Sequence, residues 1–123
     1  HEVILDKFGP QRLDFSLAIV RGRVHMYFTG KNANLLLPDT IESQKWTHIA
    51  IRQDVNTLRL SIFRNGREIL STMLHSTPMK NDSPLYLGGS RIARRSGFSG
   101  ALDDLVIYRR ALGNEEIATL AAE

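Results

Sequence analysis

The sequence predicts an all-β protein, an antiparallel β-sandwich that ends in one short helix. Three observations lead to this class. Apolar and polar residues alternate along several stretches, as they do in strands with one buried face. Turn residues recur about every 8–12 residues, which is the spacing of an antiparallel sandwich. Apolar residues adopt helical spacing only after Gly113, close to the C-terminus.

The first half of the chain contains three predicted strands. Residues 2–6 form the first. Residues 13–19 alternate strictly between apolar and smaller or polar side chains, and residues 24–28 repeat the pattern. Arg21 and Gly22 lie between the last two stretches and predict a turn, because glycine accepts backbone angles that other residues avoid.

The second half begins with a hairpin signal. Residues 47–52 and 58–63 alternate, and Asn65-Gly66 follows before another strand at residues 68–74. Asn-Gly favours a two-residue hairpin turn, since both positions need a positive φ. We expect a core that contains Ile49, Ile51, Leu58, Leu60, Ile62, Leu105 and Ile107, with Arg59 and Ser61 more exposed.

The C-terminal region combines a predicted strand with the helix. Residues 84–87 form a short strand, and a longer one starts with Asp103 and Asp104. Gly113 or Asn114 can cap the helix that follows. Two glutamates then occupy its first turn, where the helix dipole favours negative charge.

Composition excludes several classes of protein. The chain has 123 residues, enough for one domain, and no cysteine, which excludes disulfides and thiol catalysis. No apolar run reaches the roughly 18 residues that span a bilayer, so we expect no membrane insertion. The net charge of +3 is mild, and we expect no nucleic-acid partner.

Three stretches carry a family resemblance. They are "KWTHIAI" (residues 45–51), "LRLSIFRNGREI" (residues 58–69) and "FSGALDDLVIYRRALGNEEIATL" (residues 98–120). In this order they resemble the laminin-G-like jelly rolls of the concanavalin-A-like lectin and glucanase superfamily. The match runs from Val3 to the end, although Gly113 stands where the family usually has a serine cap.

The resemblance implies one laminin-G-like domain over residues 1–123 that lacks its N-terminal part. Family members usually carry some tens of residues before this start, including a strand beside the closing one. We therefore expect a fragment of a longer chain, whose open apolar edge needs cover from a partner chain, a swapped strand or an upstream segment.

Asp103 is the candidate metal ligand. It shares a strand face with Leu105 and Ile107, so we expect it to be partly buried and to need hydrogen bonds or a cation. In related domains the matching aspartate often helps to hold a structural calcium ion, which takes six to eight oxygen ligands. Backbone amides and Ca²⁺ remain alternative partners for this carboxylate, while Asp104 should face the other side and pair with an arginine.

Arg91, Arg94 and Arg95 form the candidate ligand-binding cluster. They lie in a predicted loop, and arginine forks bind sulfate, carboxylate or phosphate groups with two hydrogen bonds. Some laminin-G domains bind sulfated glycans through such clusters. A solvated loop is the alternative. Candidates for stacking on a sugar ring are Tyr27, Trp46, Phe63 and Tyr86.

The sequence contains no motif of a known catalytic site. Gly-x-Ser-x-Gly and the Glu-x-Asp-x-x-Glu pattern of the superfamily's glucanases are absent. We therefore expect a non-catalytic extracellular or cell-surface module, carbohydrate-binding or adhesive, attached to a larger protein. Its partners would be a glycan, an extracellular protein, or other domains or chains of that protein. The alternatives are a structural accessory domain without a ligand and a glycoside hydrolase.

Overall fold

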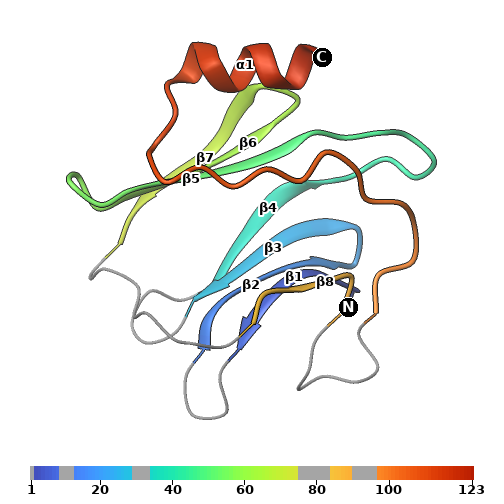
Figure 1. Cartoon of the computed structure of the whole chain (residues 1–123). Coiled ribbons are helices and arrows are strands. Elements are labelled where there is room, and N and C mark those ends of the chain that lie inside the picture. The colour runs from blue at the N-terminus through green and yellow to red at the C-terminus, as the bar shows by residue number, and fades with distance from the viewer. Residues whose placement is uncertain (1, 9–12, 29–33, 75–83, 90–96) are drawn as a thin grey trace. The chain divides into compact units, whose positions relative to one another are not determined.

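Two antiparallel sheets and one helix make up the computed structural model of the chain (Figure 1). It describes residues 2–8, 13–28, 34–74, 84–89 and 97–123. The chain divides into two compact units, His1–Ile41 with Pro78–Leu105 and Glu42–Thr77 with Val106–Glu123. One sheet lies in each unit. The all-β, antiparallel class predicted from the sequence is confirmed.

The first unit holds a five-stranded sheet. Its order is β4-β3-β2-β1-β8, with every neighbouring pair antiparallel. A two-residue turn joins β2 to β3, and Arg21 and Gly22 both adopt the positive φ expected of it, 52° and 79°. The strands are β1 (Glu2–Phe8), β2 (Leu13–Val20), β3 (Arg23–Phe28), β4 (Asn34–Thr40) and β8 (Tyr86–Leu87).

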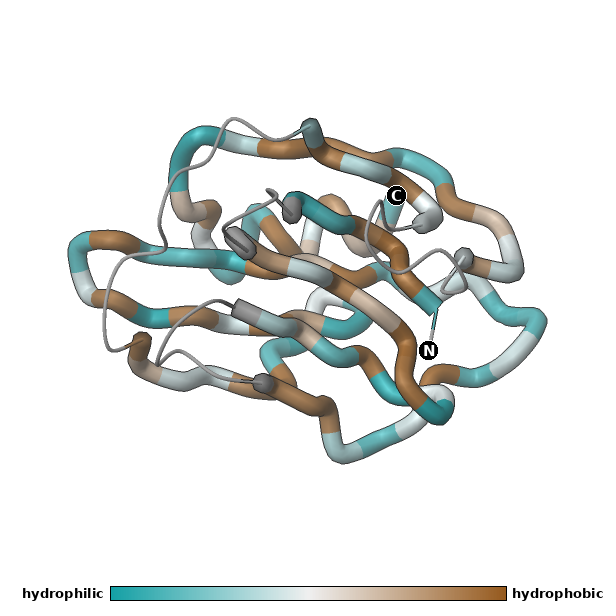
Figure 2. The backbone as a smooth tube through the Cα atoms, turned by 90° about the horizontal axis from the view of Figure 1, so that it is seen from below, coloured by the Kyte–Doolittle hydropathy of each residue, from teal (hydrophilic) through white to brown (hydrophobic). Residues whose placement is uncertain are grey.

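One face of this sheet is apolar. Hydrophobic and hydrophilic residues alternate along the strands (Figure 2). The buried members of the apolar face are Leu17, Val24, Met26 and Leu37. Strand β4 was not predicted, because its sequence NLLLPDT does not alternate and contains Pro38. The sheet tolerates this proline because β4 lies at an edge and its pairing with β3 is irregular.

The second unit holds a three-stranded sheet and the helix. The strands are β5 (Ile49–Asp54), β6 (Arg59–Arg64) and β7 (Arg67–Met73), in the order β5-β6-β7. Asn65 and Gly66 form the predicted turn with φ of 51° and 81°. Helix α1 (Asn114–Ala122) lies against this turn, since a Cβ on Gly66 would be 3.1 Å from Ala118 Cα (Figure 1).

The central strand β6 is buried on both faces. Leu60 and Ile62 are buried as predicted. The expectation for Ser61 is wrong, because this side chain is only 1% exposed and belongs to the same face as Phe63. The expected burial of Leu58, Ile49 and Ile51 is wrong in degree, because all three are only half-buried. Leu58 lies before the strand with a φ of 55°, and β5 is an edge strand. Strand β6 therefore has two covered faces where the alternation predicted one.

The predicted closing strand does not form. Residues 101–108 have no assigned secondary structure, and Leu105 and Ile107 are 51% and 67% exposed instead of buried. A strand needs a neighbour for its backbone groups, and in the described part of the chain no strand pairs with this segment. Asp104 instead adopts a φ of 53°, and its N–H donates to Oδ1 of Asp103 at 2.8 Å. Such local bonds compete with a strand ladder.

Gly66→Ala tests the packing of α1 on the hairpin. The added methyl group would be strained by the positive φ and would press on Ala118 Cα at 3.1 Å and Ala121 Cβ at 3.2 Å. We expect a loss of about 2 kcal/mol or more in the free energy of unfolding, measured by urea denaturation. Gly22→Ala is the control, because its φ is similar but its nearest neighbour is a threonine methyl at 3.4 Å. Equal losses in the two variants would contradict the contact with the helix.

Candidate functional site

The residues expected from the sequence to form a site differ in their exposure to solvent, and three of them are not described. Arg91, Arg94 and Arg95 lie outside the described residues. Among the candidate stacking side chains, Phe63 is 1% exposed and has no open ring face, whereas Trp46 is 69% exposed. Tyr27 and Tyr86 are half-buried. Trp46, Tyr27 and Tyr86 therefore have solvent-accessible surface that a sugar ring could contact.

Asp103 is not the partly buried carboxylate that was expected. Its side chain is exposed and accepts a local hydrogen bond from the Asp104 N–H. Asp104 also faces solvent, and no described arginine pairs with it. Within the described residues no three His, Cys, Asp or Glu side chains gather as a metal site would require. Since calcium takes six to eight oxygen ligands, the described residues do not fit a calcium site by themselves.

A buried carboxylate lies elsewhere, on β1. Asp6 is 0% exposed and stands opposite Ser16 on β2, which is 6% exposed, and opposite Tyr86 on β8. Ser16 in turn stands opposite Tyr27 on β3. Directly opposed residues of antiparallel strands share a sheet face. Tyr86, Asp6, Ser16 and Tyr27 therefore form one polar row across four strands.

This polar row was missed in the sequence. Asp6 ends the first predicted strand and carries no motif, and the register of four strands is needed to align it with the two tyrosines. Burial of a carboxylate is costly unless hydrogen bonds or opposite charge compensate it. Asp6 and Ser16, the two central residues of this row, are buried. Their environment is that of structural residues and not of an open binding site.

Arg52 organises the second unit. Its Nη1 donates to the carbonyl oxygen of Leu112 at 3.1 Å and to Oδ1 of Asn114 at 2.6 Å. Nη2 donates to Oγ of Ser61 at 3.4 Å. The guanidinium carbon lies 5.0 Å from the centre of the Phe63 ring, within range of a cation–π contact. One side chain thus joins β5, β6 and the first residue of α1.

A hollow of about 350 Å³ opens beside this guanidinium. Asp54 and Arg59 stand directly opposite each other on β5 and β6, yet no ion pair joins them among the described contacts. Asp54 Oδ1 accepts the N–H groups of Asn56 and Thr57 at 3.0 and 3.4 Å, which leaves Oδ2 open. The lining residues are Arg52, Asp54, Thr57, Arg59, Ala111, Leu112 and Gly113. We call this the Arg52 hollow.

The Arg52 hollow offers both donors and acceptors of hydrogen bonds. Arg59 Nη1 donates to Ser71 Oγ at 3.0 Å, which steadies its guanidinium while other N–H groups stay exposed. The sequence could have indicated part of this site, since Arg52 ends one predicted strand and Arg59 lies on the next. The pairing register that brings Arg59 opposite Asp54 was needed to complete it.

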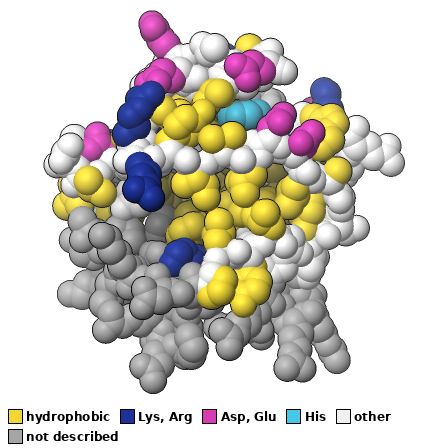
Figure 3. Space-filling model, viewed as in Figure 1, with side chains coloured by type: hydrophobic (Ala, Val, Ile, Leu, Met, Phe, Trp, Pro, Cys, Tyr) yellow, Lys and Arg dark blue, Asp and Glu magenta, His cyan; other side chains and the backbone are white. Residues whose placement is uncertain are grey.

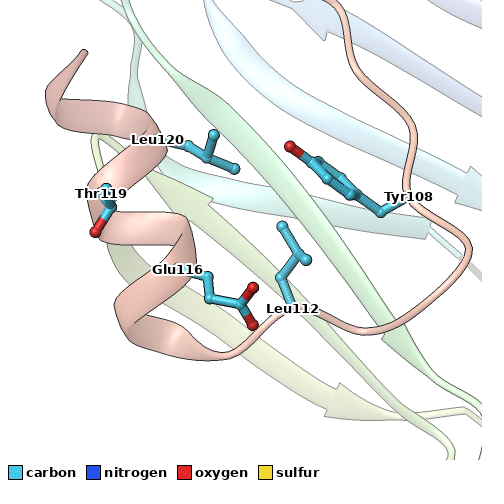
Figure 4. Close-up of a pocket in the computed structure, with 5 residues that line it drawn as sticks. All are labelled: Tyr108, Leu112, Glu116, Thr119 and Leu120. Carbon is cyan, nitrogen blue, oxygen red and sulfur yellow. The ribbon is translucent and has the colours of Figure 1, made fainter.

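A second hollow of about 270 Å³ lies between α1 and the segment before it (Figure 4). Tyr108, Leu112 and Leu120 point toward one another there, and Thr119 points away from them (Figure 4). This surface is mainly apolar.

Glu116 caps the N-terminus of α1. Its carboxylate accepts two hydrogen bonds from Arg110 and one from the N–H of Gly113, the N-cap residue. The bonds from Arg110, followed by the one from Gly113, lower the pKa of Glu116 from 4.5 to about 2. The same pair raises the pKa of Arg110. The prediction that Gly113 or Asn114 caps the helix is confirmed at Gly113, while Asn114 accepts from Arg52 instead.

Comparison with known proteins assigns the family. A laminin-G model of the concanavalin A-like lectin/glucanases superfamily matches residues 3–118. The chain therefore belongs to this family, as its three motifs suggested. No curated protein matches the chain.

Solved structures support the fold. Residues 221–444 of an S-layer domain-containing protein from Clostridium thermocellum align with 98% of the chain at 22% identity and a TM-score of 0.58. The alignment covers 62% of that solved chain. In the described part of the chain, no helix has the length and apolar character needed to cross a membrane.

Asp6→Ala tests the buried carboxylate. We expect a loss of about 1–3 kcal/mol in the free energy of unfolding, because truncation of this fully buried side chain leaves a cavity between β2 and β8. The matched variant Asp103→Ala removes an exposed carboxylate and should change stability by about 0.5 kcal/mol or less. Urea denaturation measures both. A larger loss of stability in Asp103→Ala than in Asp6→Ala would contradict this assignment and favour Asp103 as the structurally important carboxylate.

The depressed pKa of Glu116 predicts a pH dependence. A carboxylate whose pKa is lowered by folding stabilises the folded state above its unfolded value, near 4.5, and loses this contribution as the pH falls toward about 2. The stability difference between the parent and Glu116→Gln should therefore be constant above pH 5 and shrink from there to about pH 2. Glu115→Gln is the control, since the Glu115 side chain makes no described hydrogen bond. A difference that does not change with pH would contradict the Arg110–Glu116 pair.

Proposed function

We propose that the chain is a non-catalytic module of an extracellular or cell-surface protein, and that it binds a carbohydrate in the Arg52 hollow. The single observation that carries this proposal is the opposed, unbridged pair Asp54 and Arg59 beside the anchored Arg52. Charged side chains that are held in place without neutralising each other are available to a ligand.

The chemistry of the Arg52 hollow suits a saccharide. A sugar hydroxyl can donate to Asp54 Oδ2 and accept from a guanidinium N–H, so one ring can satisfy both groups. Carboxylate or sulfate groups on the sugar would suit the two arginines, as proposed from the sequence for Arg91, Arg94 and Arg95. The volume of about 350 Å³ is within the usual range of small-ligand sites.

The proposal also covers the location of the protein and its attachment to other domains. The family includes lectins, and the similar solved chain is that of an S-layer domain-containing protein. Both favour a location at the cell surface and attachment to further domains. Adhesion to an extracellular protein is the related alternative. Ca²⁺ at Asp103 also stays a proposal, with further ligands needed beyond the described residues.

A glycan array with and without Ca²⁺ tests the binding function, followed by titration of the best oligosaccharide. Asp54→Asn keeps the Oδ1 acceptor of the turn but removes the charge, and Arg59→Gln shortens the donor. We expect each variant to weaken binding at least about tenfold, as loss of a charged hydrogen bond does. Arg67→Gln, at an exposed position on β7, should bind like the parent.

Other outcomes separate the alternatives. Absence of binding to every glycan would favour a structural accessory domain. Binding that Asp54→Asn and Arg59→Gln leave unchanged would move the site away from the Arg52 hollow. Release of reducing sugars from a polysaccharide, lost in Asp103→Ala, would favour the glycoside hydrolase that the name of the superfamily also includes.

A further inference from the structure

The Arg52 hollow carries charges of both signs, and every residue that lines it belongs to the second unit. Arg52, Asp54 and Arg59 share one sheet face, because Asp54 stands opposite Arg59 and Arg52 is two residues before Asp54. Charged side chains of both signs also lie at the surface around α1 (Figure 3). The second unit therefore presents a mixed surface in this region and not a uniformly basic one.

The two arginines of the hollow differ in what they offer to a ligand. Arg52 Nη1 donates to the Leu112 carbonyl oxygen and to Asn114 Oδ1, which uses both of its N–H groups. Arg59 is exposed and makes one described hydrogen bond, from Nη1 to Ser71 Oγ, so its Nη2 and Nε donors form an open planar fork. Arg59 is therefore the side chain that can hold an anion with two hydrogen bonds, while Arg52 adds positive charge.

Asp54 sets the opposite requirement. Its Oδ1 accepts the N–H groups of Asn56 and Thr57, and among the described residues no hydrogen bond reaches Oδ2. An ionised carboxylate oxygen accepts hydrogen bonds and has no proton to donate, so it suits a hydroxyl group. An anionic group beside this oxygen would be repelled. A ligand that satisfies the hollow therefore presents an anion to Arg59 and a hydroxyl donor to Asp54.

We propose that the Arg52 hollow selects uronate sugars, in which one carboxylate and several free hydroxyl groups belong to the same ring. The carboxylate lies on the Arg59 fork, and a hydroxyl group donates to Asp54 Oδ2. This inference rests on the carbohydrate-binding function proposed above and names the class of sugar.

Asp54 is the specificity-determining residue in this arrangement. In a densely sulfated glycan each sulfate replaces a hydroxyl donor with negative charge, so Asp54 excludes such ligands by repulsion. A neutral sugar satisfies Asp54 but lacks the carboxylate that matches a guanidinium fork with two parallel hydrogen bonds. Only the uronate meets both requirements.

Isothermal titration calorimetry with matched probes tests this selection. The probes are oligosaccharides of galacturonate, glucuronate and mannuronate. Each is compared with its methyl ester, which removes the charge and keeps the hydroxyl groups, and with its O-sulfated derivative, which keeps the carboxylate and replaces the hydroxyl groups. We expect at least one unmodified uronate to bind at least about tenfold more tightly than both of its derivatives.

Two variants assign the preferences to their residues. Arg59→Gln should bind the acid and its methyl ester with equal affinity, because the fork is lost. Asp54→Asn keeps the Oδ1 acceptor of the turn and should weaken binding of the unmodified uronate at least about tenfold. The same variant should bind the O-sulfated derivative more tightly than the parent does, because the repulsion is removed.

Opposite changes in affinity for two probes separate specificity from a folding defect, which would weaken all probes together. Thermal melts check that each variant is folded. Arg67→Gln and Glu68→Gln remove exposed charges on β7 outside the hollow and should bind all probes like the parent.

Three results would overturn the inference. The parent could bind no uronate probe. The glycan array then decides the binding function separately, since a neutral glycan whose binding is lost in Asp54→Asn and Arg59→Gln would still support it. The parent could bind an O-sulfated derivative as tightly as the unmodified uronate. Asp54→Asn could weaken every probe equally, which would leave Asp54 without a role in specificity.

Discussion

The guanidinium of Arg52 is the interaction on which the second unit depends. A strand hydroxyl, a loop carbonyl and the side chain of the first residue of α1 accept hydrogen bonds from its N–H groups, and its guanidinium carbon lies over the Phe63 ring. Arginine suits this role because its donors form a rigid fork and its charge persists at every ordinary pH. Since Arg52 also borders the hollow proposed as the ligand site, the contacts that hold the helix start in place also fix one wall of this hollow.

Backbone pairing decides which apolar segments are buried. Strand β6 has a neighbour on each side, and its residues Leu60 to Phe63 are buried. Residues 105–108 have equally strand-prone side chains but no described strand beside them, and their side chains are exposed. The difference lies in the partner strand and not in local propensity, because a strand is stable only when its hydrogen bonds are completed across the sheet.

The residues of the candidate site were only partly predictable. The expectation that Arg91, Arg94 and Arg95 bind an anionic glycan falls outside the described residues and stays a prediction. Asp103 was expected to be the buried carboxylate, and Asp6 has that position instead. The wrong expectation for Asp103 and the unforeseen Arg52 hollow have one cause. A single strand shows which of its residues share a face, but only the register shows which residues of other strands lie beside them.

By itself the sequence determined the all-β class, the two tight turns at Arg21-Gly22 and Asn65-Gly66, the C-terminal helix and the family. These features follow from local rules, since alternation, positive-φ turn residues and helix capping act within a few residues. Only the tertiary structure decided that β4 forms around Pro38, that Ser61 and Asp6 are buried, and that Arg52, Asp54 and Arg59 border one hollow. These features depend on the pairing of strands and on the helix that packs beside them, which bring together residues that are separate in the chain.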